Sequence, residues 1–164
     1  MDLWRKFLFP DLRRRWFWLR LGIVAAVAYS FFGYVCIPTW IHGKSMEPTY
    51  HDGTVNFCWC PRFWFREPQP GAVVIVRLGG RSAMYLKRLV AVAGDTVEFR
   101  NGRLLVNGKE QVEPYVQGPC DWNLEPRTVK PGYVYVVGDN RSVPLEQHRF
   151  GQTERRRIMG GPLW

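Results

Sequence analysis

The feature that most constrains this chain is an apolar run near its N-terminus. No residue from Leu21 to Ile37 carries a charge, and only Arg20 separates this run from the apolar residues at 16–19. A helix needs about 20 mostly apolar residues to cross the hydrocarbon core of a bilayer, and an arginine near one end can reach the headgroups. The run therefore predicts one transmembrane helix over residues 16–37, preceded by a basic segment at 1–15.

A cleaved signal peptide is the alternative interpretation of this run. The apolar core is longer than that of an ordinary signal peptide, and Trp16 and Trp18 are typical of the aromatic belt at a membrane interface. We therefore expect an uncleaved anchor. The arginines at 13–15 precede the run, so the positive-inside rule predicts a cytoplasmic N-terminus and an extracytoplasmic domain over residues 38–164.

The charge of the chain also indicates that its partner is a membrane. The formal net charge is +9, which is typical of proteins that bind nucleic acid or an anionic membrane surface. The basic residues stand before the apolar run and in a second cluster at 155–157, without a zinc-finger spacing, an RNP-like motif or a Gly-rich phosphate loop. We therefore expect a lipid bilayer as partner and no nucleic acid. The aromatic stretch at 57–65 either packs in the core or touches lipid.

The cysteines indicate neither a metal site nor a definite disulfide. Cys36 falls in the apolar run, whereas Cys58 and Cys60 are too close along an extended segment to bond each other readily. Either of the latter two remains able to pair with Cys120 in an oxidising compartment. No second Cys or His pair stands at a ligand spacing, so the sequence predicts no metal and no cofactor.

Beyond Trp40 the apolar residues form short alternating runs that are separated by turn dipeptides. Asn101-Gly102, for example, is a strong hairpin signal, and no segment keeps a helical period. Residues 110–130 are expected to form a loop excursion. The pattern predicts a mainly β protein, a coiled antiparallel sheet or barrel-like domain behind one N-terminal transmembrane helix. The expected strands are 54–59, 72–78, 84–92, 96–100, 103–106 and 133–137.

Ser45 lies in the stretch HGKSMEPTYHDG at 42–53 and is either a turn residue or a nucleophile. A serine needs a base at neutral pH, and the nearby His42 and His51 offer only proximity in sequence, without a Gly-x-Ser-x-Gly elbow. The other histidine is His148. Lys87 stands in a strongly apolar strand, where burial would lower its pKa and make it a base. The alternation alone slightly favours an exposed edge-strand lysine.

Three short motifs, taken in order, resemble the conserved boxes of the type I signal peptidase family. They are Ser-Met-Glu-Pro-Thr at 45–49, Lys87-Arg88 followed by Gly94-Asp95, and Gly-Asp-Asn-Arg-Ser at 138–142. The resemblance runs from about Ile41 to Trp164. It implies a membrane-bound serine endopeptidase in which Ser45 is the nucleophile and Lys87 its general base. The implied substrates are the N-terminal signal peptides of exported preproteins, with small residues at positions −1 and −3.

The resemblance also implies roles for the neighbours of this dyad. The oxyanion hole would rest on the backbone N–H of Ser45, with Gly43 at the position where some members carry a hydroxyl. The supporting residues would be Gly138, Asp139, Asn140, Arg141, Ser142, Glu146 and Arg149. The candidates for the substrate pocket are Ile41, Met46, Leu86 and Val143.

The last box departs from the family pattern. Pro144 stands where many members have a serine that orients the lysine, so the support of Lys87 is left to Ser142 or to a backbone carbonyl. Glu146 keeps a carboxylate of this box, and Arg149 stands one place late for its arginine. We therefore expect a structural ion pair with altered geometry at this position.

Several alternatives remain open at this point. A conjugative-pilus maturation peptidase or a mitochondrial inner-membrane protease subunit would share the dyad, whereas residues 1–40 argue against a soluble self-cleaving repressor. A non-enzymatic alternative is a membrane-anchored β-domain that binds a partner and is inactive because of its altered last box. The implied location is the inner (plasma) membrane of the cell, or alternatively the mitochondrial inner membrane.

Overall fold

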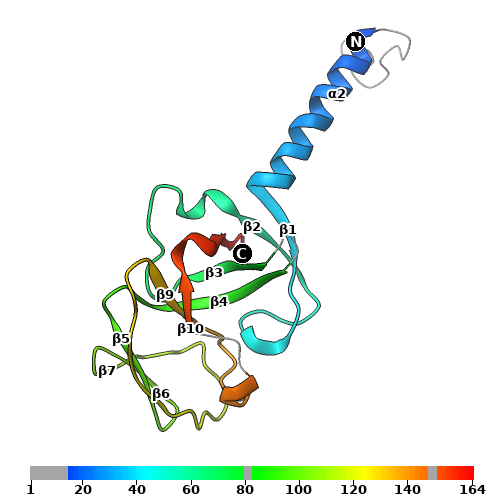
Figure 1. Ribbon diagram of the computed structural model, residues 1–164. Coiled ribbons are helices and arrows are strands. Elements are labelled where there is room, and N and C mark those ends of the chain that lie inside the picture. Colours follow the sequence, from blue (N-terminus) through cyan, green and yellow to red (C-terminus); the bar gives the residue numbers. More distant parts are fainter. Residues whose placement is uncertain (1–14, 80–82, 148–150) are drawn as a thin grey trace.

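The computed structural model describes residues 15–79, 83–147 and 151–164. Helix α2, Arg15–Ser30, projects away from the rest of the molecule and continues through a short π-helical turn, η1, Phe31–Val35 (Figure 1). None of its residues is buried, and the helical stretch Arg15–Val35 is long and apolar enough to cross a membrane. The predicted helix extended to residue 37, but Cys36 and Ile37 already belong to a strand.

The β body contains a sheet of seven antiparallel strands. In spatial order these are β1 (Cys36–Trp40), β2 (Val55–Trp59), β11 (Ile158–Pro162), β3 (Val73–Gly79), β4 (Ala83–Val92), β9 (Tyr133–Val137) and β10 (Gly151–Glu154). Strand β1 follows directly from the helix, and its pairing with β2 ties the helix to the sheet. Two aromatic contacts reinforce this junction, because Phe31 packs near Trp59 and Phe32 near Phe57.

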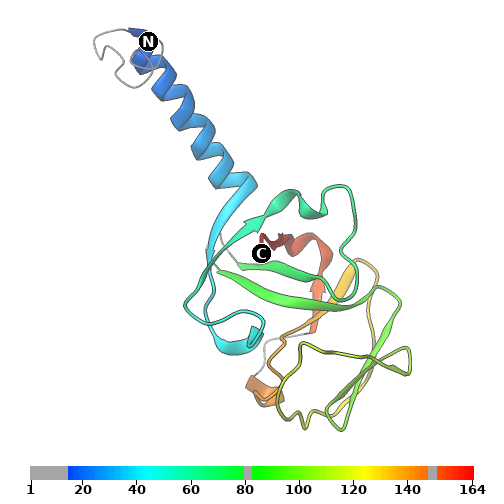
Figure 2. The ribbon, with the colours of Figure 1, turned by 180° about the vertical axis from the view of Figure 1, so that it is seen from behind.

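A second, four-stranded sheet lies at the end of the molecule away from α2 (Figures 1 and 2). Its order is β7 (Lys109–Glu110), β6 (Arg103–Val106), β5 (Thr96–Arg100) and β8 (Leu124–Thr128). The described short helical turns are η2 (Lys44–Met46), η3 (Cys60–Phe63), η4 (Leu145–Gln147) and η5 (Arg155–Arg157). The prediction of a mainly β, antiparallel fold behind one apolar helix is confirmed.

Among the described residues, the core consists of three apolar clusters. One joins the two sheets through Phe99, Leu104, Trp122 and Tyr135, and a second fills the middle of the large sheet around Val74 and Leu89. The third packs Cys58 and Cys60 against Ile75. All four cysteines are free. Cys120 packs against the first cluster and the Cys58–Cys60 pair belongs to the third, so the disulfide considered from the sequence does not form.

All six predicted strands are present, with bounds that differ by at most one residue. The prediction of a loop over 110–130 is wrong for Glu110, which ends β7, and for residues 124–128, which form β8 and pair with β5. Most of β8 is exposed, so it lacks the apolar alternation that marks a half-buried strand. The prediction of an exposed edge position for Lys87 is wrong as well, because β4 lies between β3 and β9.

Candidate active site

The turn that carries Ser45 is fixed on both sides. Gly43 precedes it with φ +89°, a backbone conformation that favours glycine, and its N–H donates to Asp52 Oδ1 at 2.8 Å. The backbone of Ile41 bonds Thr54 and Gly53, so the approach to Ser45 is held like a short hairpin. Met46, which is 1% exposed, anchors the other side of the turn in the interior.

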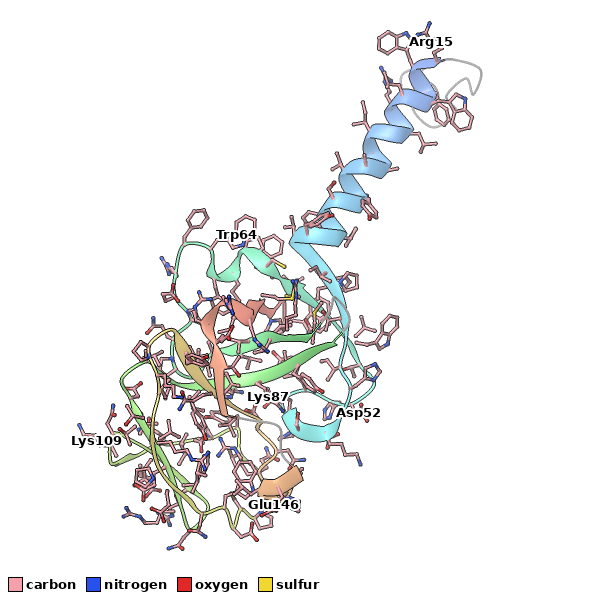
Figure 3. All side chains as sticks on the ribbon, viewed as in Figure 1. Arg15, Asp52, Trp64, Lys87, Lys109 and Glu146 are labelled. Atoms are coloured by element: carbon pink, nitrogen blue, oxygen red, sulfur yellow. The ribbon has the colours of Figure 1, made fainter. Side chains whose placement is uncertain are left out.

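Lys87 reaches this turn from the middle of β4. Its side chain is 3% exposed, and Lys87 Nζ lies 2.6 Å from Ser45 Oγ. Figure 3 shows the labelled Lys87 next to the loop that carries Asp52. Burial lowers the pKa of Lys87 to about 8, and the negative charge of Asp139 opposes this shift. An amine with such a pKa is neutral in a large fraction of molecules at mildly alkaline pH.

Arg88, the next residue of β4, forms a bidentate ion pair with Asp139. Arg88 Nε and Nη2 lie 2.8 and 2.6 Å from the two carboxylate oxygens, and Asp139 is fully buried. Thr49 donates its hydroxyl to the same carboxylate at 2.6 Å, and Arg88 also donates to the Gly71 carbonyl. This pair joins β4, the segment after β9 and the Ser45 turn at one point. The hydrogen bonds and the arginine compensate the buried carboxylate.

Asn140 clamps the backbone of the Ser45 turn. Its N–H donates to the Ser45 carbonyl at 3.1 Å, and its side-chain Nδ2 donates to the Lys44 carbonyl at 3.0 Å. Asn140 Oδ1 in turn accepts from the Ser142 N–H, which shapes the loop after β9. The clamp holds the serine opposite Lys87 through main-chain contacts.

Arg141 is buried and holds the loop after β9 in place. It donates through Nε to the Gly138 carbonyl and makes two contacts with Glu113, at 2.6 and 3.1 Å. Its guanidinium also faces the rings of Phe99 and Trp122. The residues from Gly138 to Arg141 therefore connect the serine turn to the apolar cluster between the sheets.

The remaining residues named from the sequence lie further out. Ser142 Oγ faces Gly118, where an added Cβ would come within 2.7 Å of it. Val143 offers its carbonyl to Trp122 Nε1 and is not among the pocket residues. Pro144 and Glu146 are exposed, and Figure 3 shows Glu146 on η4. Arg149 and His148 lie outside the described residues.

An apolar pocket opens beside Ser45. Its walls are the extended segment 39–43, Met46 and the segment 84–86 of β4, with Asn56 and Ile75 also lining it. Three of the four pocket candidates, Ile41, Met46 and Leu86, line this pocket. The β4–β9 pairing begins at Arg88, so segment 84–86 pairs with β3 on one side and borders the pocket.

Sequence reasoning missed three residues of this region. Glu113 and Tyr115 lie in the stretch that was expected to be a loop, yet Glu113 bonds Arg141 and the Tyr115 ring stacks on Arg88 at 3.8 Å. An acidic and an aromatic residue in an aperiodic segment give no pattern that predicts such contacts. In the sequence, Asn56 is an ordinary polar residue of a predicted strand. In the structure it is 3% exposed and lines the pocket.

Fold and site together define a class: an antiparallel β protein behind an apolar helix, with a serine and a buried lysine in contact beside an apolar pocket. The chain matches the family described as signal peptidase, peptidase S26, over residues 13–162. The protein therefore belongs to the S26 family of signal peptidases. The resemblance drawn from its three motifs is confirmed.

The chain shares moderate sequence identity with individual relatives. The chain is 37% identical over 131 residues to the probable thylakoidal processing peptidase 2, chloroplastic, of Arabidopsis thaliana, covering 75% of this chain and 36% of the relative. It spans little more than a third of that relative's length. The probable signal peptidase I-1 of Synechocystis sp. is 30% identical over 154 residues, which cover 89% of this chain and 78% of the relative. A solved signal peptidase I from Enterococcus faecalis aligns with a TM-score of 0.47 and 26% identity, covering 58% of this chain and 97% of that one.

Proposed function

We propose that the protein is a membrane-bound serine endopeptidase that removes N-terminal signal peptides from exported preproteins. The observation that carries this proposal is the 2.6 Å contact between Lys87 Nζ and Ser45 Oγ at a buried position. The names of relatives such as the Synechocystis protein support the substrate class. Cleavage of a model preprotein by the wild-type protein, with Ser45→Ala as control, tests it.

In the proposed mechanism, neutral Lys87 takes the proton of the Ser45 hydroxyl as Ser45 Oγ attacks the scissile carbonyl. The backbone N–H of Ser45 stabilises the oxyanion, beside a Gly43 that has no side chain to add a donor. The protonated Lys87 then gives its proton to the leaving amine, and an acyl-enzyme on Ser45 remains. Lys87 finally activates a water that releases the signal peptide.

The pocket beside Ser45 suits small apolar side chains. Residues 39–43 and 84–86 present two extended segments, between which an extended substrate would lay alternate side chains toward Met46 and Ile75. Small residues at −1 and −3 of the substrate fit this arrangement. The retained Ser45–Lys87 contact favours an enzyme over an inactive binding domain, and cleavage tests with different preproteins separate a general from a specialised peptidase.

We place the domain against the bilayer from which its anchor emerges. Several large apolar side chains are exposed on the elements that follow or pack near the anchor: Trp40 at the end of β1, Trp64 and Phe65 after η3, and Leu163 and Trp164 after β11. Figure 3 shows Trp64 on the side from which the helix leaves. Phe57 bridges Trp164 to the aromatic residues of η1, which makes this surface continuous with the anchor. An exposed apolar patch of this kind is typical of a membrane contact.

Replacing Trp64 and Phe65 together by serine is expected to lower the cleavage of a vesicle-embedded preprotein at least about tenfold, because a loss of about 1.4 kcal/mol is already tenfold and even partial burial of two aromatic side chains in lipid contributes that much. Cleavage of a short soluble peptide should stay at the wild-type rate. Val112→Ser, at a residue that is 92% exposed and far from the anchor in sequence, is the matched control. An equal loss with both substrates would refute the lipid contact.

We also propose that the N-terminus lies in the cytoplasm and the peptidase domain on the opposite face of the inner (plasma) membrane. The arginines before the apolar helix support this orientation, with a mitochondrial inner membrane as the alternative location. Protease added to the outer face of intact cells should remove a tag that follows Trp164. A protected C-terminal tag together with an accessible N-terminal one would reverse the orientation.

A further inference from the structure

The segment that connects β7 to β8 lies outside the three family motifs, yet it contacts the catalytic region. Between β7 and β8 the chain passes beside η4 (Figures 1 and 2), where Trp122 Nε1 donates to the Val143 carbonyl. Within this segment Tyr115 donates its hydroxyl to Glu113 Oε1 at 2.6 Å. The same Glu113 holds the buried Arg141.

The ring of Tyr115 lies against the other arginine of the site. Arg88 Cζ is 3.8 Å from the centroid of the Tyr115 ring, while the edge of the same guanidinium binds both oxygens of Asp139. The guanidinium is therefore fixed on its face by Tyr115 and on its edge by Asp139. Its remaining donor, Nη1, is held by the Gly71 carbonyl. A stacked arginine gains a cation–π attraction and loses little freedom when it binds a carboxylate.

We propose that Tyr115, oriented by Glu113, is a positioning residue for the Ser45–Lys87 pair, because its ring holds Arg88 in place against Asp139. The proposal rests on the proposed peptidase function and adds to it a residue that none of the three motifs contains. Two contacts transmit the effect. Asp139 receives the Thr49 hydroxyl from the serine turn, and Lys87 is the neighbour of Arg88 on β4.

The consequence concerns the charge of Lys87. The carboxylate of Asp139 raises the pKa of Lys87, and burial lowers it by more. When Arg88 loses its stacking partner, its pairing with Asp139 loosens and water enters the site. The carboxylate of Asp139 is then less compensated, and Lys87 is less desolvated. Both changes raise the pKa of Lys87 and favour its charged form. The charged or titratable groups that face this network are Arg88 from β4, Asp139 and Arg141 after β9, Glu113 after β7, and Tyr50 after the serine turn.

The test is a pH profile of kcat/KM for full-length wild type and variants, with a preprotein substrate. Tyr115→Leu removes the ring and is expected to move the acidic limb upward by about half a pH unit or more. Activity would fall about threefold below the limb and remain unchanged well above it. Tyr115→Phe keeps the ring and loses only the hydrogen bond to Glu113, so its limb should lie between those of wild type and Tyr115→Leu, closer to wild type. Val112→Ala, in the same segment, should match wild type throughout.

The outcomes separate this proposal from the function on which it rests. A limb that stays in place in a folded Tyr115→Leu protein, or an equal loss of activity at every pH, would overturn the positioning role and leave the peptidase intact. A fully active Lys87→Ala would instead overturn the lysine-based function, and the positioning role with it. If Tyr115→Leu fails to fold, Tyr115→Met gives the second readout, because its flexible side chain fills the space of the ring without the aromatic face on which Arg88 stacks, and it should move the limb in the same direction.

Discussion

Ser45→Ala and Lys87→Ala are each expected to lower kcat/KM for preprotein cleavage at least about a thousandfold, which leaves no detectable product. Ser45 supplies the attacking oxygen, and Lys87 Nζ, 2.6 Å away, is the group placed to take its proton. Because the two act as one unit, the double variant should lose no more activity than either single one.

Matched controls distinguish this dyad from other bases. Lys44 is the neighbour of Ser45 and its residue is exposed, so Lys44→Ala should keep most of the activity. His42→Ala, His51→Ala and His148→Ala should do so as well, although His42 lines the pocket and its replacement should mainly change KM. If His42→Ala or His51→Ala proved as inactive as Ser45→Ala, a histidine-based mechanism would have to replace the one proposed.

Much of the fold could be predicted because its strands obey simple periodicity. The hairpin at Asn101-Gly102 has the positive φ angles that the dipeptide favours, and β5 and β6 flank it in the expected register. Strand β9 is a solid run of β-branched and aromatic residues between Pro131-Gly132 and Gly138, and such a run indicates a buried strand. Local sequence and tertiary packing agree in these elements.

Strand β11 could not be predicted for the opposite reason. It sits between β2 and β3 in the large sheet, yet its sequence, IMGGP, looks like a turn. At Gly160 an added Cβ would lie 2.4 Å from the Trp59 carbonyl oxygen, so the close approach of β2 requires glycine there. The glycine at position 160 is therefore explained by its contact with β2, which the sequence alone does not reveal.

The candidate site shows the same division. Burial of Lys87 could not be derived from alternation, because both faces of β4 are covered and Lys87 and Arg88 are both buried. The pairing of Lys87 with Ser45 was instead predicted from the order of the three family motifs. The Glu113–Arg141 pair and the Tyr115–Arg88 stack join residues far apart in the chain, and a single sequence carries no signal for such contacts.

The pH dependence of cleavage is the second large effect that we expect. Lys87 must be neutral to accept the Ser45 proton, and burial lowers its pKa to about 8 from the ordinary value of 10.5. Below that pKa the neutral fraction falls tenfold for each pH unit, so kcat/KM at pH 6 should be about fifty times lower than at pH 8. The optimum should lie at or above pH 8.

The measurement that tests the Ser45–Lys87 dyad most directly is therefore the pH profile of kcat/KM for the wild-type protein, on a peptide with alanine at −1 and −3. The dyad predicts an acidic limb near pH 8, set by Lys87 in the free enzyme. A histidine base would give a limb near about 6.5 and activity that is flat through neutrality. A limb at that lower position would contradict the account.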